Sequence, residues 1–396
     1  MEKQTVRDIN WAGKRALVRV DFNVPFGRGA NRISDDMRIR EAIPTINYIR
    51  NAGASVVLCT HLGRPGGKPT SSLELSPIAE RLAALLSARV DYVHDAPGEE
   101  ALVRARALQA GELLLIENIR FWDGEEANNT EFAQAIGRLG DVYVNDAFGT
   151  AHRAHASTEG VAHVLPGVAG LLMEKEIYFL ERVIKNPQRP LAALLGGAKV
   201  SDKIKVLERL IDHADALFVG GGMAATFLKA KGQHIGNSLL EAELVDFCSD
   251  VLLRCEAAGI TLNLPSDVVI AQKLEEGVPT RTVGVDAVPD GWMILDIGPR
   301  SADLFSMQLG AMGTVVWNGP MGVFEVPPFN TGTRTVAEGL AAGSATTVIG
   351  GGSTAEAVDA LGLADQMTHV STGGGASLEF FEGKTLPGIA ALQDKS

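Results

Sequence analysis

Apolar runs typical of buried strands alternate with helix-like patterns along most of the chain. Runs such as RALVRV, SVVLC and ELLLI are separated by segments with apolar residues at every third or fourth position. Ser76-Pro77 has the form of a helix start, and Gly53 stands where a preceding helix would end. Strands that are apolar throughout and joined by helices form parallel sheets covered on both faces. The pattern therefore predicts a doubly wound, mostly parallel α/β fold.

The alternation is interrupted between His163 and Pro190. The turn-rich LPGVAG is followed there by LLMEKEIYFLERVIK, whose periodicity predicts one long amphipathic helix over residues 171–185. A second alternating series follows, and four of its strand-like runs end in glycine clusters. Since 396 residues exceed what one hydrophobic core usually supports, we expect two doubly wound domains, 1–170 and 171–380, joined by this helix.

Composition narrows the class of protein. The net charge of −12 argues against a nucleic-acid partner, which calls for a basic face. Three cysteines form no CxxC pair, so neither a disulfide framework nor a zinc site is indicated. The polar N-terminus and the absence of a long apolar run predict a cytoplasmic protein with no membrane span. The first 170 residues carry 19 Lys+Arg against 21 Asp+Glu and the remainder 17 against 27, which favours the first part for binding an anion.

Polar and basic residues gather at the predicted strand ends of the first part. Arginine side chains there suit phosphate and carboxylate oxygens, so this edge of the sheet is predicted to form a cup for a small polyanion. A metal site at His152 and His155 is not favoured, because the HxxH spacing in a turn lacks further ligands. The residues of the cup are Asp21, Asn23, His61, Arg64, Arg120, His152, Arg153 and His155, joined by Arg38 from a helix start.

The stretch LAALLGGAKVSDKIKVL, residues 191–207, predicts a strand, a tight turn and a helix that begins with two lysines. Gly196 and Gly197 let the backbone turn and approach a ligand, while Lys199 and Lys203 attract anions at the helix start. A phosphate site is one interpretation, and an ordinary strand-to-helix turn with two solvated lysines is the other. No Walker A pattern GxxxxGK[ST] occurs in the chain.

Two further glycine clusters, GGGMAA at 220–225 and GGGSTA at 350–355, satisfy the pattern GxGxxA after a strand. This is the form of a dinucleotide fingerprint, but the acidic residue expected about twenty residues on is missing. Glycine turns facing one cleft suit a mononucleotide instead, with Glu325 positioned at a strand end to hold ribose hydroxyls. The residues alone leave open a phosphotransferase, a non-catalytic nucleotide-binding module and an NAD-dependent dehydrogenase.

A distributed set of motifs resembles the phosphoglycerate kinase family. They occur in order over nearly the whole chain: VRVDFNVP, THLGRP, ENIRF, AHRAH, LGGAKVSDKI, GGGMAATF, WNGPMGVFE and HVSTGGGASLEFFEGK. The resemblance implies two domains separated by a cleft, with residues 381–396 packing back on the first. It implies phosphoryl transfer between 1,3-bisphosphoglycerate and Mg-ADP in glycolysis, giving 3-phosphoglycerate and ATP after hinge closure. The partners are then small molecules, and we expect a monomer.

Position by position, the resemblance also implies roles for the site residues. Domain 1–170 would bind phosphoglycerate, with Arg38 also facing the transferring phosphoryl group. The residues implied for this binding are Asp21, Asn23, Arg38, His61, Arg64, Arg120 and Arg153. In domain 171–380, Lys199 would follow the phosphoryl group and Lys203 would hold nucleotide phosphates. The remaining nucleotide-side residues are Gly220, Gly221, Gly222, Asn318, Glu325, Gly350, Gly351, Gly352, Ser353 and Thr354, with Gly373, Gly374 and Gly375 as a glycine turn near the transfer site.

One position departs from the family pattern. The family loop usually reads GGGD[ST], with an aspartate for magnesium, whereas this chain has Ser353. Because serine carries no charge, direct carboxylate coordination at this position is lost. Magnesium could be held by nucleotide phosphates, water and the hydroxyl of Ser353 or Thr354. We therefore expect retained activity with weaker magnesium affinity.

Overall fold

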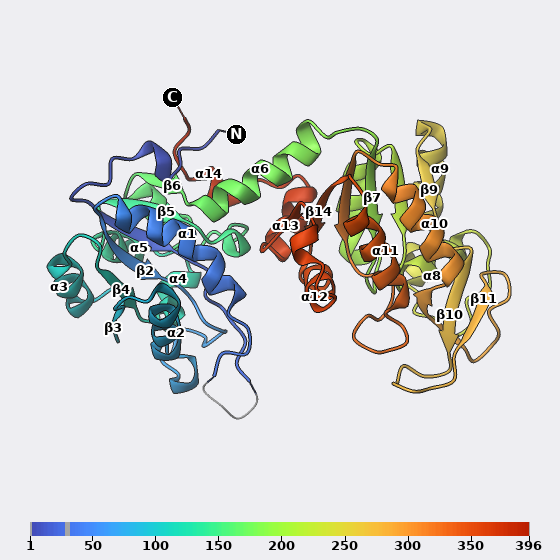
Figure 1. The fold of residues 1–396 in the computed structure, drawn as a ribbon, viewed down its shortest axis with the longest axis horizontal. Helices are drawn as coiled ribbons and strands as arrows, with labels where there is room; N and C mark the ends of the chain where they lie inside the picture. The colour runs from blue at the N-terminus through green and yellow to red at the C-terminus, as the bar shows by residue number, and fades with distance from the viewer. Residues whose placement is uncertain (1, 28–31, 396) are drawn as a thin grey trace. The chain divides into compact units, whose positions relative to one another are not determined.

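The computed structural model describes residues 2–27 and 32–395. The chain forms two compact units (Figure 1): unit 1 comprises Met1–Tyr178 with Thr385–Ser396, and unit 2 comprises Phe179–Lys384. The helix expected between the two alternating series is α6 (Leu171–Lys185). It begins in unit 1 and ends in unit 2, so the structure divides the chain within this helix.

Unit 1 contains a six-stranded sheet in which every strand pairing is parallel. Its order is β3-β4-β2-β1-β5-β6. The chain builds outward from β1 through β2 on one side and continues with β5 and β6 on the other, so the order reverses between β1 and β5. In open α/β sheets ligands bind at the carboxyl ends of strands beside such a reversal. The strands are β1 (Arg15–Arg19), β2 (Ser55–Cys59), β3 (Asp91–Val93), β4 (Leu113–Ile116), β5 (Val142–Asn145) and β6 (Gly167–Ala169).

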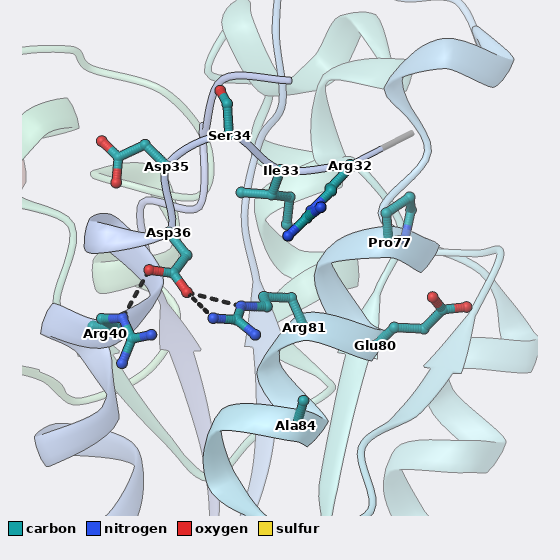
Figure 2. A pocket seen from close by; sticks show the side chains of 10 residues that line it. All are labelled: Arg32, Ile33, Ser34, Asp35, Asp36, Arg40, Pro77, Glu80, Arg81 and Ala84. Carbon is teal, nitrogen blue, oxygen red and sulfur yellow. Dashed lines mark hydrogen bonds and ion pairs between the residues drawn. The ribbon is translucent and has the colours of Figure 1, made fainter. Parts of the chain in front are cut away.

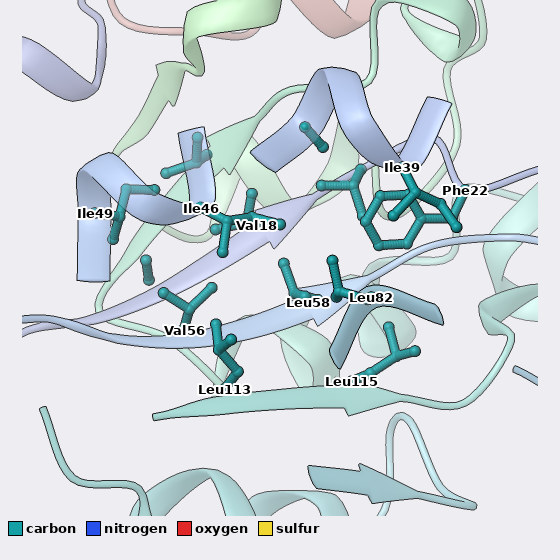
Figure 3. Packing of buried hydrophobic residues seen from close by; sticks show 14 of the residues in the cluster. Val18, Phe22, Ile39, Ile46, Ile49, Val56, Leu58, Leu82, Leu113 and Leu115 are labelled. Carbon is teal, nitrogen blue, oxygen red and sulfur yellow. The ribbon is translucent and has the colours of Figure 1, made fainter. Parts of the chain in front are cut away.

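Helices cover the unit 1 sheet and bury its apolar side chains. Figure 3 shows Ile39, Ile46 and Ile49 of α1 above Val18 of β1 and Val56 of β2, and all five are fully buried. Burying one such side chain is worth about 1.5 to 3 kcal/mol, so this layer is a main source of the unit's stability. The helices of unit 1 are α1 (Met37–Asn51), α2 (Ser76–Leu86), α3 (Glu99–Ala107), α4 (Asp123–Glu126), α5 (Thr130–Gly137) and α14 (Pro387–Ala390).

The C-terminal segment packs beside the N-terminal segment in unit 1. The Gln4 amide donates to the carbonyl of Gln393 at 2.8 Å, and Lys3 Nζ lies 2.8 Å from Asp394 Oδ1. The Gly388 amide donates to the carbonyl of Ala151 at 2.9 Å. These contacts hold the segment after Lys384 on the unit that contains the first half of the chain.

Unit 2 repeats the architecture with a second six-stranded parallel sheet, ordered β15-β14-β13-β7-β8-β9. Its order reverses between β7 and β13. The prediction of two α/β units with parallel sheets is therefore confirmed. The strands are β7 (Leu191–Leu195), β8 (Ala216–Val219), β9 (Thr261–Asn263), β13 (Thr314–Asn318), β14 (Thr346–Gly350) and β15 (His369–Val370).

Unit 2 also contains a three-stranded antiparallel sheet that the sequence pattern did not predict. It consists of β10 (Asp267–Ala271), β11 (Arg281–Gly284) and β12 (Met293–Ile297), in the order β11-β10-β12. Arg281 stacks over the ring of Trp292, 4.4 Å from its centroid. Only β10 and β12 are strongly apolar, and β11 has no buried residue. A search for apolar, buried strands therefore misses β11 and with it the sheet.

The helices of unit 2 include one that begins later than expected. The turn after β7 is followed by a short 3-10 helix (Ser201–Lys203), and α7 starts only at Ile204. Lys199 and Lys203 thus precede the helix, where the sequence pattern placed them at its start. The helices are α7 (Ile204–Ile211), α8 (Met223–Ala230), α9 (Val245–Ala258), α10 (Pro299–Gly310), α11 (Thr331–Ala342), α12 (Gly352–Ala360) and α13 (Gly375–Phe381). Over the described residues, no helix combines the length and apolar character needed to cross a bilayer.

Candidate functional site

The carboxyl ends of the unit 1 strands bring together most of the predicted anion cup. Asp21 follows β1, and its carboxylate forms an ion pair with Arg38 in the first turn of α1. His61 follows β2, and its Nδ1 lies 3.9 Å from Asp21 Oδ1. Arg120 and Arg153 are near enough to His61 to act on its charge. The carboxyl-terminal edge of this sheet, where the strand order reverses, therefore carries the cationic side chains that the sequence predicted there.

A second set of contacts fixes the turn that carries Arg64. Asn23 Oδ1 accepts the Gly63 amide at 2.9 Å, and Arg120 Nη1 donates to the Gly63 carbonyl at 2.7 Å. Arg64 follows Gly63 directly and is exposed. The structure thus assigns Asn23 and Arg120 a part in shaping the turn, while Arg64 is free to reach a ligand.

Two histidines at this edge, His61 and His155, have a lowered pKa. Burial, followed by the nearby Arg19, Arg120, Arg153 and Arg38, lowers the pKa of His61 well below its usual value. Burial, followed by the nearby Arg120, Arg153 and Arg19, lowers the pKa of His155 to about 4. Arg120 keeps its charge, since burial lowers its pKa only to about 10. At neutral pH, His61 and His155 therefore add no positive charge to the site, whereas Arg120 does.

The sequence pattern missed a buried layer beneath the cup. Arg19 is the last residue of β1 and is 1% exposed, and Glu125 of α4 is fully buried. Both bond to Ser157: Arg19 Nε donates to its hydroxyl at 2.9 Å, and that hydroxyl donates to Glu125 Oε1 at 2.6 Å. An arginine directly between the apolar residues Val18 and Val20 was the signal in the sequence that could have revealed this layer.

The depressed pKa of His155 predicts an acid-sensitive contribution to stability. Between the unfolded value near 6.5 and the folded value of about 4, the unfolded chain binds a proton that the folded chain does not. The free energy of unfolding should fall with decreasing pH in this window, by up to about 1.4 kcal/mol per pH unit. Urea unfolding should show that the free energy of unfolding falls less between pH 7 and pH 5 for His155→Gln than for the wild type. Equal losses would contradict the prediction.

In unit 2, the ends of β7, β13 and β14 surround a cavity of about 620 Å³ that we call the lysine pocket. Its walls include Lys199 and Lys203, the first turn of α12, and the glycine turn before α13. Within the described part of the chain, no side chain caps the N-terminus of α12, and the amide groups of such an uncapped helix start can donate to an anion. The predicted residues that line this pocket are Lys199, Lys203, Asn318, Gly351, Gly352, Ser353, Thr354, Gly374 and Gly375.

Backbone segments meet closely at the floor of the lysine pocket. A Cβ on Gly196 would lie 2.2 Å from the Pro320 carbonyl oxygen, and one on Gly319 would lie 2.1 Å from that of Gly196. Gly319 also has φ +102°, a conformation that side chains disfavour. Close approach between the turn after β7 and the end of β13 thus requires glycine at both positions, and the φ of Gly319 adds a second reason there.

Asn318 gives the lysine pocket an unsatisfied donor. Its Oδ1 accepts a hydrogen bond from Lys203 Nζ, and its buried Nδ2 has no partner among the described residues. Nδ2 would lie 3.3 Å from a Cβ on Gly351, so it points toward the α12 loop. Burial lowers the pKa of Lys203, with Asp202 acting in the opposite sense. A buried donor beside a lysine and a helix N-terminus is an arrangement that an anionic ligand completes.

The lysine pocket continues into a second cavity of about 460 Å³, the apolar slot. The two share Gly197, Ala198, Pro320 and Ser353. Hydrophobic side chains dominate the slot, and the predicted residues Gly222 and Glu325 also line it. Its hydrophobic lining residues, which the sequence pattern did not identify, are Leu239, Leu274, Met293, Ile294, Leu295 and Val323.

Four predicted glycines line neither cavity. Gly220 packs against Met321, and Gly221 lies over the backbone of Gly197 and Pro320. Gly350 packs against Phe381 and Asn318, and the Gly373 amide donates to the Ser371 hydroxyl. These residues support the walls of the lysine pocket and the apolar slot without facing the cavities.

Unit 1 has a further hollow of about 570 Å³ between the starts of α1 and α2 (Figure 2). Its arginines are offset by carboxylates: Asp36 accepts hydrogen bonds from Arg40 Nε and from Arg81 Nε, each at 2.7 Å. Asp35 and Glu80 add further negative charge. Three arginines (Arg32, Arg40 and Arg81) and three carboxylates (Asp35, Asp36 and Glu80) line this hollow, so its lining has no net positive charge that would favour a second anion site.

Comparison with known proteins covers both units. A family model described as Phosphoglycerate kinase matches residues 6–384. The phosphoglycerate kinase of Herpetosiphon aurantiacus is 53% identical over 395 residues, and that of Synechococcus elongatus is 52% identical over 401, each covering 100% of both chains.

Solved structures agree. The phosphoglycerate kinase of Coxiella burnetii matches with a TM-score of 0.90 and 42% identity, and that of Pyrococcus horikoshii with 0.84 and 33%, each covering 98% of both chains. The GxGxxA matches are therefore not the mark of a dehydrogenase. Sequence similarity over the full length and the shared fold lead to one assignment: the chain belongs to the phosphoglycerate kinase family.

Proposed function

We propose a division of roles for the phosphoglycerate kinase reaction in this chain. As a member of this family, the chain is a glycolytic kinase that transfers a phosphoryl group to a carboxyl acceptor. In our proposal, the cup of unit 1 binds 3-phosphoglycerate or 1,3-bisphosphoglycerate through its arginines, His61, Asp21 and Asn23. Unit 2 binds ADP or ATP, with phosphates in the lysine pocket and the base in the apolar slot.

One observation carries the nucleotide half of this proposal. The lysine pocket and the apolar slot share four residues, so a single ligand can occupy both. A nucleotide has matching parts: an anionic chain for the lysines and helix N-terminus, and a flat base for the apolar walls. Glu325, exposed at the slot, is then available to accept hydrogen bonds from ribose hydroxyls.

The chemistry requires charge neutralisation and alignment more than proton transfer. The attacking group is already an anion, a carboxylate in one direction and a β-phosphate oxygen in the other, so no general base is needed. Charge develops on the equatorial oxygens of the moving phosphoryl group, and arginine, lysine and helix N-termini stabilise it. Arg38 and Lys199 are our candidates for this role, because each is a cation at the carboxyl end of its sheet.

A coupled assay tests the proposal directly. With ATP, magnesium and 3-phosphoglycerate, formation of 1,3-bisphosphoglycerate is followed through oxidation of NADH by glyceraldehyde-3-phosphate dehydrogenase. Turnover is expected only when both substrates are present. Binding of ATP with no turnover would instead identify a nucleotide-binding module, and the proposed function would be wrong.

Magnesium is part of the proposal, and the pocket residues fit it only in part. Among the described residues, no group of three or more His, Cys, Asp or Glu side chains is placed to hold a metal ion. The Thr354 hydroxyl is buried and accepts the Gly319 amide at 2.6 Å, whereas Ser353 is exposed and lines both cavities. Asp202 adds a carboxylate to the lysine pocket. These oxygens suit an ion carried mainly by nucleotide phosphates, whose charge it would neutralise.

Ser353→Asp is expected to lower the magnesium concentration that gives half-maximal activity, by about tenfold. A carboxylate at this position supplies a charged hard oxygen that serine lacks. Initial rates are measured against free magnesium at fixed nucleotide, with Ser353→Asn as a control of similar size and no charge. An unchanged magnesium requirement for the aspartate variant would refute the expectation.

The two ligands must meet, so we also propose that closure about a hinge at α6 accompanies binding of both. Closure would exclude water, which otherwise hydrolyses the acyl phosphate. Small-angle scattering should give a smaller radius of gyration with 3-phosphoglycerate and a non-hydrolysable ATP analogue than with either alone. An unchanged radius with both ligands would count against closure. We further propose a monomer acting in the cytoplasm on these small molecules.

A further inference from the structure

Arg19 is the most enclosed cation of unit 1, and all three of its guanidinium nitrogens have acceptors. Nε donates to the Ser157 hydroxyl at 2.9 Å, and Nη1 donates to the carbonyl of Val20. Nη2 lies 3.1 Å from Nδ1 of His61. With 1% of its surface exposed, Arg19 has little room to contact a ligand itself.

The contact between Arg19 and His61 determines where the imidazole carries its proton. A guanidinium has donors and no acceptor, so the bond forms only if Nδ1 offers its lone pair. A neutral ring then has its proton on Nε2. The other candidate partner of Nδ1 is Asp21 Oδ1, which at 3.9 Å is too far for a hydrogen bond and is already paired with Arg38 through its other oxygen.

The buried layer fixes Arg19 in this orientation. Glu125 accepts both the amide of Ser157 at 2.9 Å and its hydroxyl at 2.6 Å, so the oxygen of Ser157 is turned to accept from Arg19. Arg19 and Glu125 also interact electrostatically in the core: burial raises the pKa of Glu125, and the charge of Arg19 opposes that rise. The chain Glu125, Ser157, Arg19, His61 thus runs from the core to the anion cup.

We propose that Arg19 is a positioning residue that holds His61 as a neutral donor, with its Nε2–H presented to the bound phosphoglycerate. The proposal rests on the proposed function, because it takes His61 as a ligand-facing residue. It gives the cup an oriented hydrogen-bond donor without a further positive charge. The groups facing His61 are Arg19, Asp21, Arg38, Arg120 and Arg153, and the four arginines all oppose protonation of the ring.

The decisive measurement is the protonation state of His61 in the full-length chain without ligand. Long-range proton–nitrogen NMR of ¹⁵N-histidine-labelled protein distinguishes protonated from unprotonated ring nitrogens, and His61→Gln identifies the His61 signals. From pH 8 to pH 5 we expect an unprotonated Nδ1 and a protonated Nε2. A proton on Nδ1, or a doubly protonated ring at neutral pH, would overturn the proposal.

Variants at position 19 test whether Arg19 determines the protonation state of His61. In Arg19→Leu, Nδ1 loses its donor and one of the four arginines that oppose a second proton is removed, so the pKa of His61 should rise and more of the ring should be doubly protonated at pH 5 than in the wild type. Arg19→Lys keeps a charge for Glu125 and serves if the leucine variant fails to fold; it should shift the His61 signals less. Arg15→Leu, at the other end of β1 and bonded to the Leu139 carbonyl, is the matched control and should leave His61 unchanged. Unaltered His61 signals in both Arg19 variants would overturn the proposal.

Measurements of 3-phosphoglycerate binding distinguish a failure of this proposal from a failure of the proposed function. Calorimetry with 3-phosphoglycerate at pH 8, where the His61 ring of Arg19→Leu is neutral but no longer held with its proton on Nε2, should give about tenfold weaker affinity for this variant and no change for Arg15→Leu. Addition of 3-phosphoglycerate to the wild type should shift the Nε2 signal. The expected tautomer with no response to 3-phosphoglycerate would overturn the placement of His61 in the substrate site, and with it the proposed role of Arg19.

Discussion

Replacing Arg38 by alanine is expected to lower kcat by about a thousandfold while the fold of unit 1 is retained. Losing one preorganised donor at a developing charge typically costs a hundred- to a thousandfold, and losing an arginine that neutralises a transferring phosphoryl group about a thousandfold or more. Arg38 is 36% exposed in the first turn of α1 and pairs with Asp21, so its removal opens no core cavity. The coupled assay with ATP and 3-phosphoglycerate gives kcat, and circular dichroism monitors the fold.

Arg40→Ala provides the matched control for Arg38→Ala. Arg40 lies on the same helix two residues further on, is 55% exposed, and pairs with Asp36 at 2.7 Å. The Arg40→Ala variant therefore removes an exposed arginine and its ion pair without changing the proposed site. Near-normal turnover is expected for Arg40→Ala. Near-normal turnover for Arg38→Ala as well would show that Arg38 does not act on the transferring group.

The parallel framework of the chain follows from local patterns that the fold preserves. The helix expected from Ser76 is α2, which starts at that residue, and the one expected over residues 171–185 is α6. Both strand-rich series form parallel sheets. These predictions succeed because strands buried on both faces and amphipathic crossover helices depend on short-range periodicity, which the sequence displays directly.

Features that depend on contacts between distant segments were harder to predict. Arg19 and Glu125 both bond to Ser157. Along the chain, Ser157 is 138 residues from Arg19 and 32 residues from Glu125. The apolar slot draws its walls from Leu239, Leu274 and the β12 region, which carry no motif of their own. Hydrophobic residues in such places are indistinguishable from core residues until the fold shows a cavity beside them.

The two lysines after β7 show how the structure changes a motif-based interpretation. Both were expected at a helix start, yet α7 begins at Ile204 and both precede it. Lys203 is half-buried and donates to Asn318, whereas Lys199 is exposed and, within the described residues, makes no ion pair or hydrogen bond. Lys203 is thus fixed in the wall of the lysine pocket, and Lys199 is the cation able to move.

This difference predicts that Lys199→Ala lowers kcat at least a hundredfold with little change in nucleotide affinity. A mobile cation can follow the phosphoryl group and stabilise it mainly in the transition state, which affects kcat more than ground-state binding. Steady-state kinetics give kcat, and equilibrium titration with ADP gives the affinity.

Two further variants test whether the effect expected for Lys199→Ala is specific to this lysine. Lys205→Ala removes an exposed lysine of α7 that lines neither cavity and should leave both quantities unchanged. Lys203→Ala should mainly weaken ADP binding, because it removes a fixed cation and frees Asn318 Oδ1. If Lys199→Ala weakened ADP binding and preserved kcat, Lys199 would be a ground-state phosphate ligand. The charge on the moving phosphoryl group would then have to be neutralised by other groups, with Arg38 the first to consider.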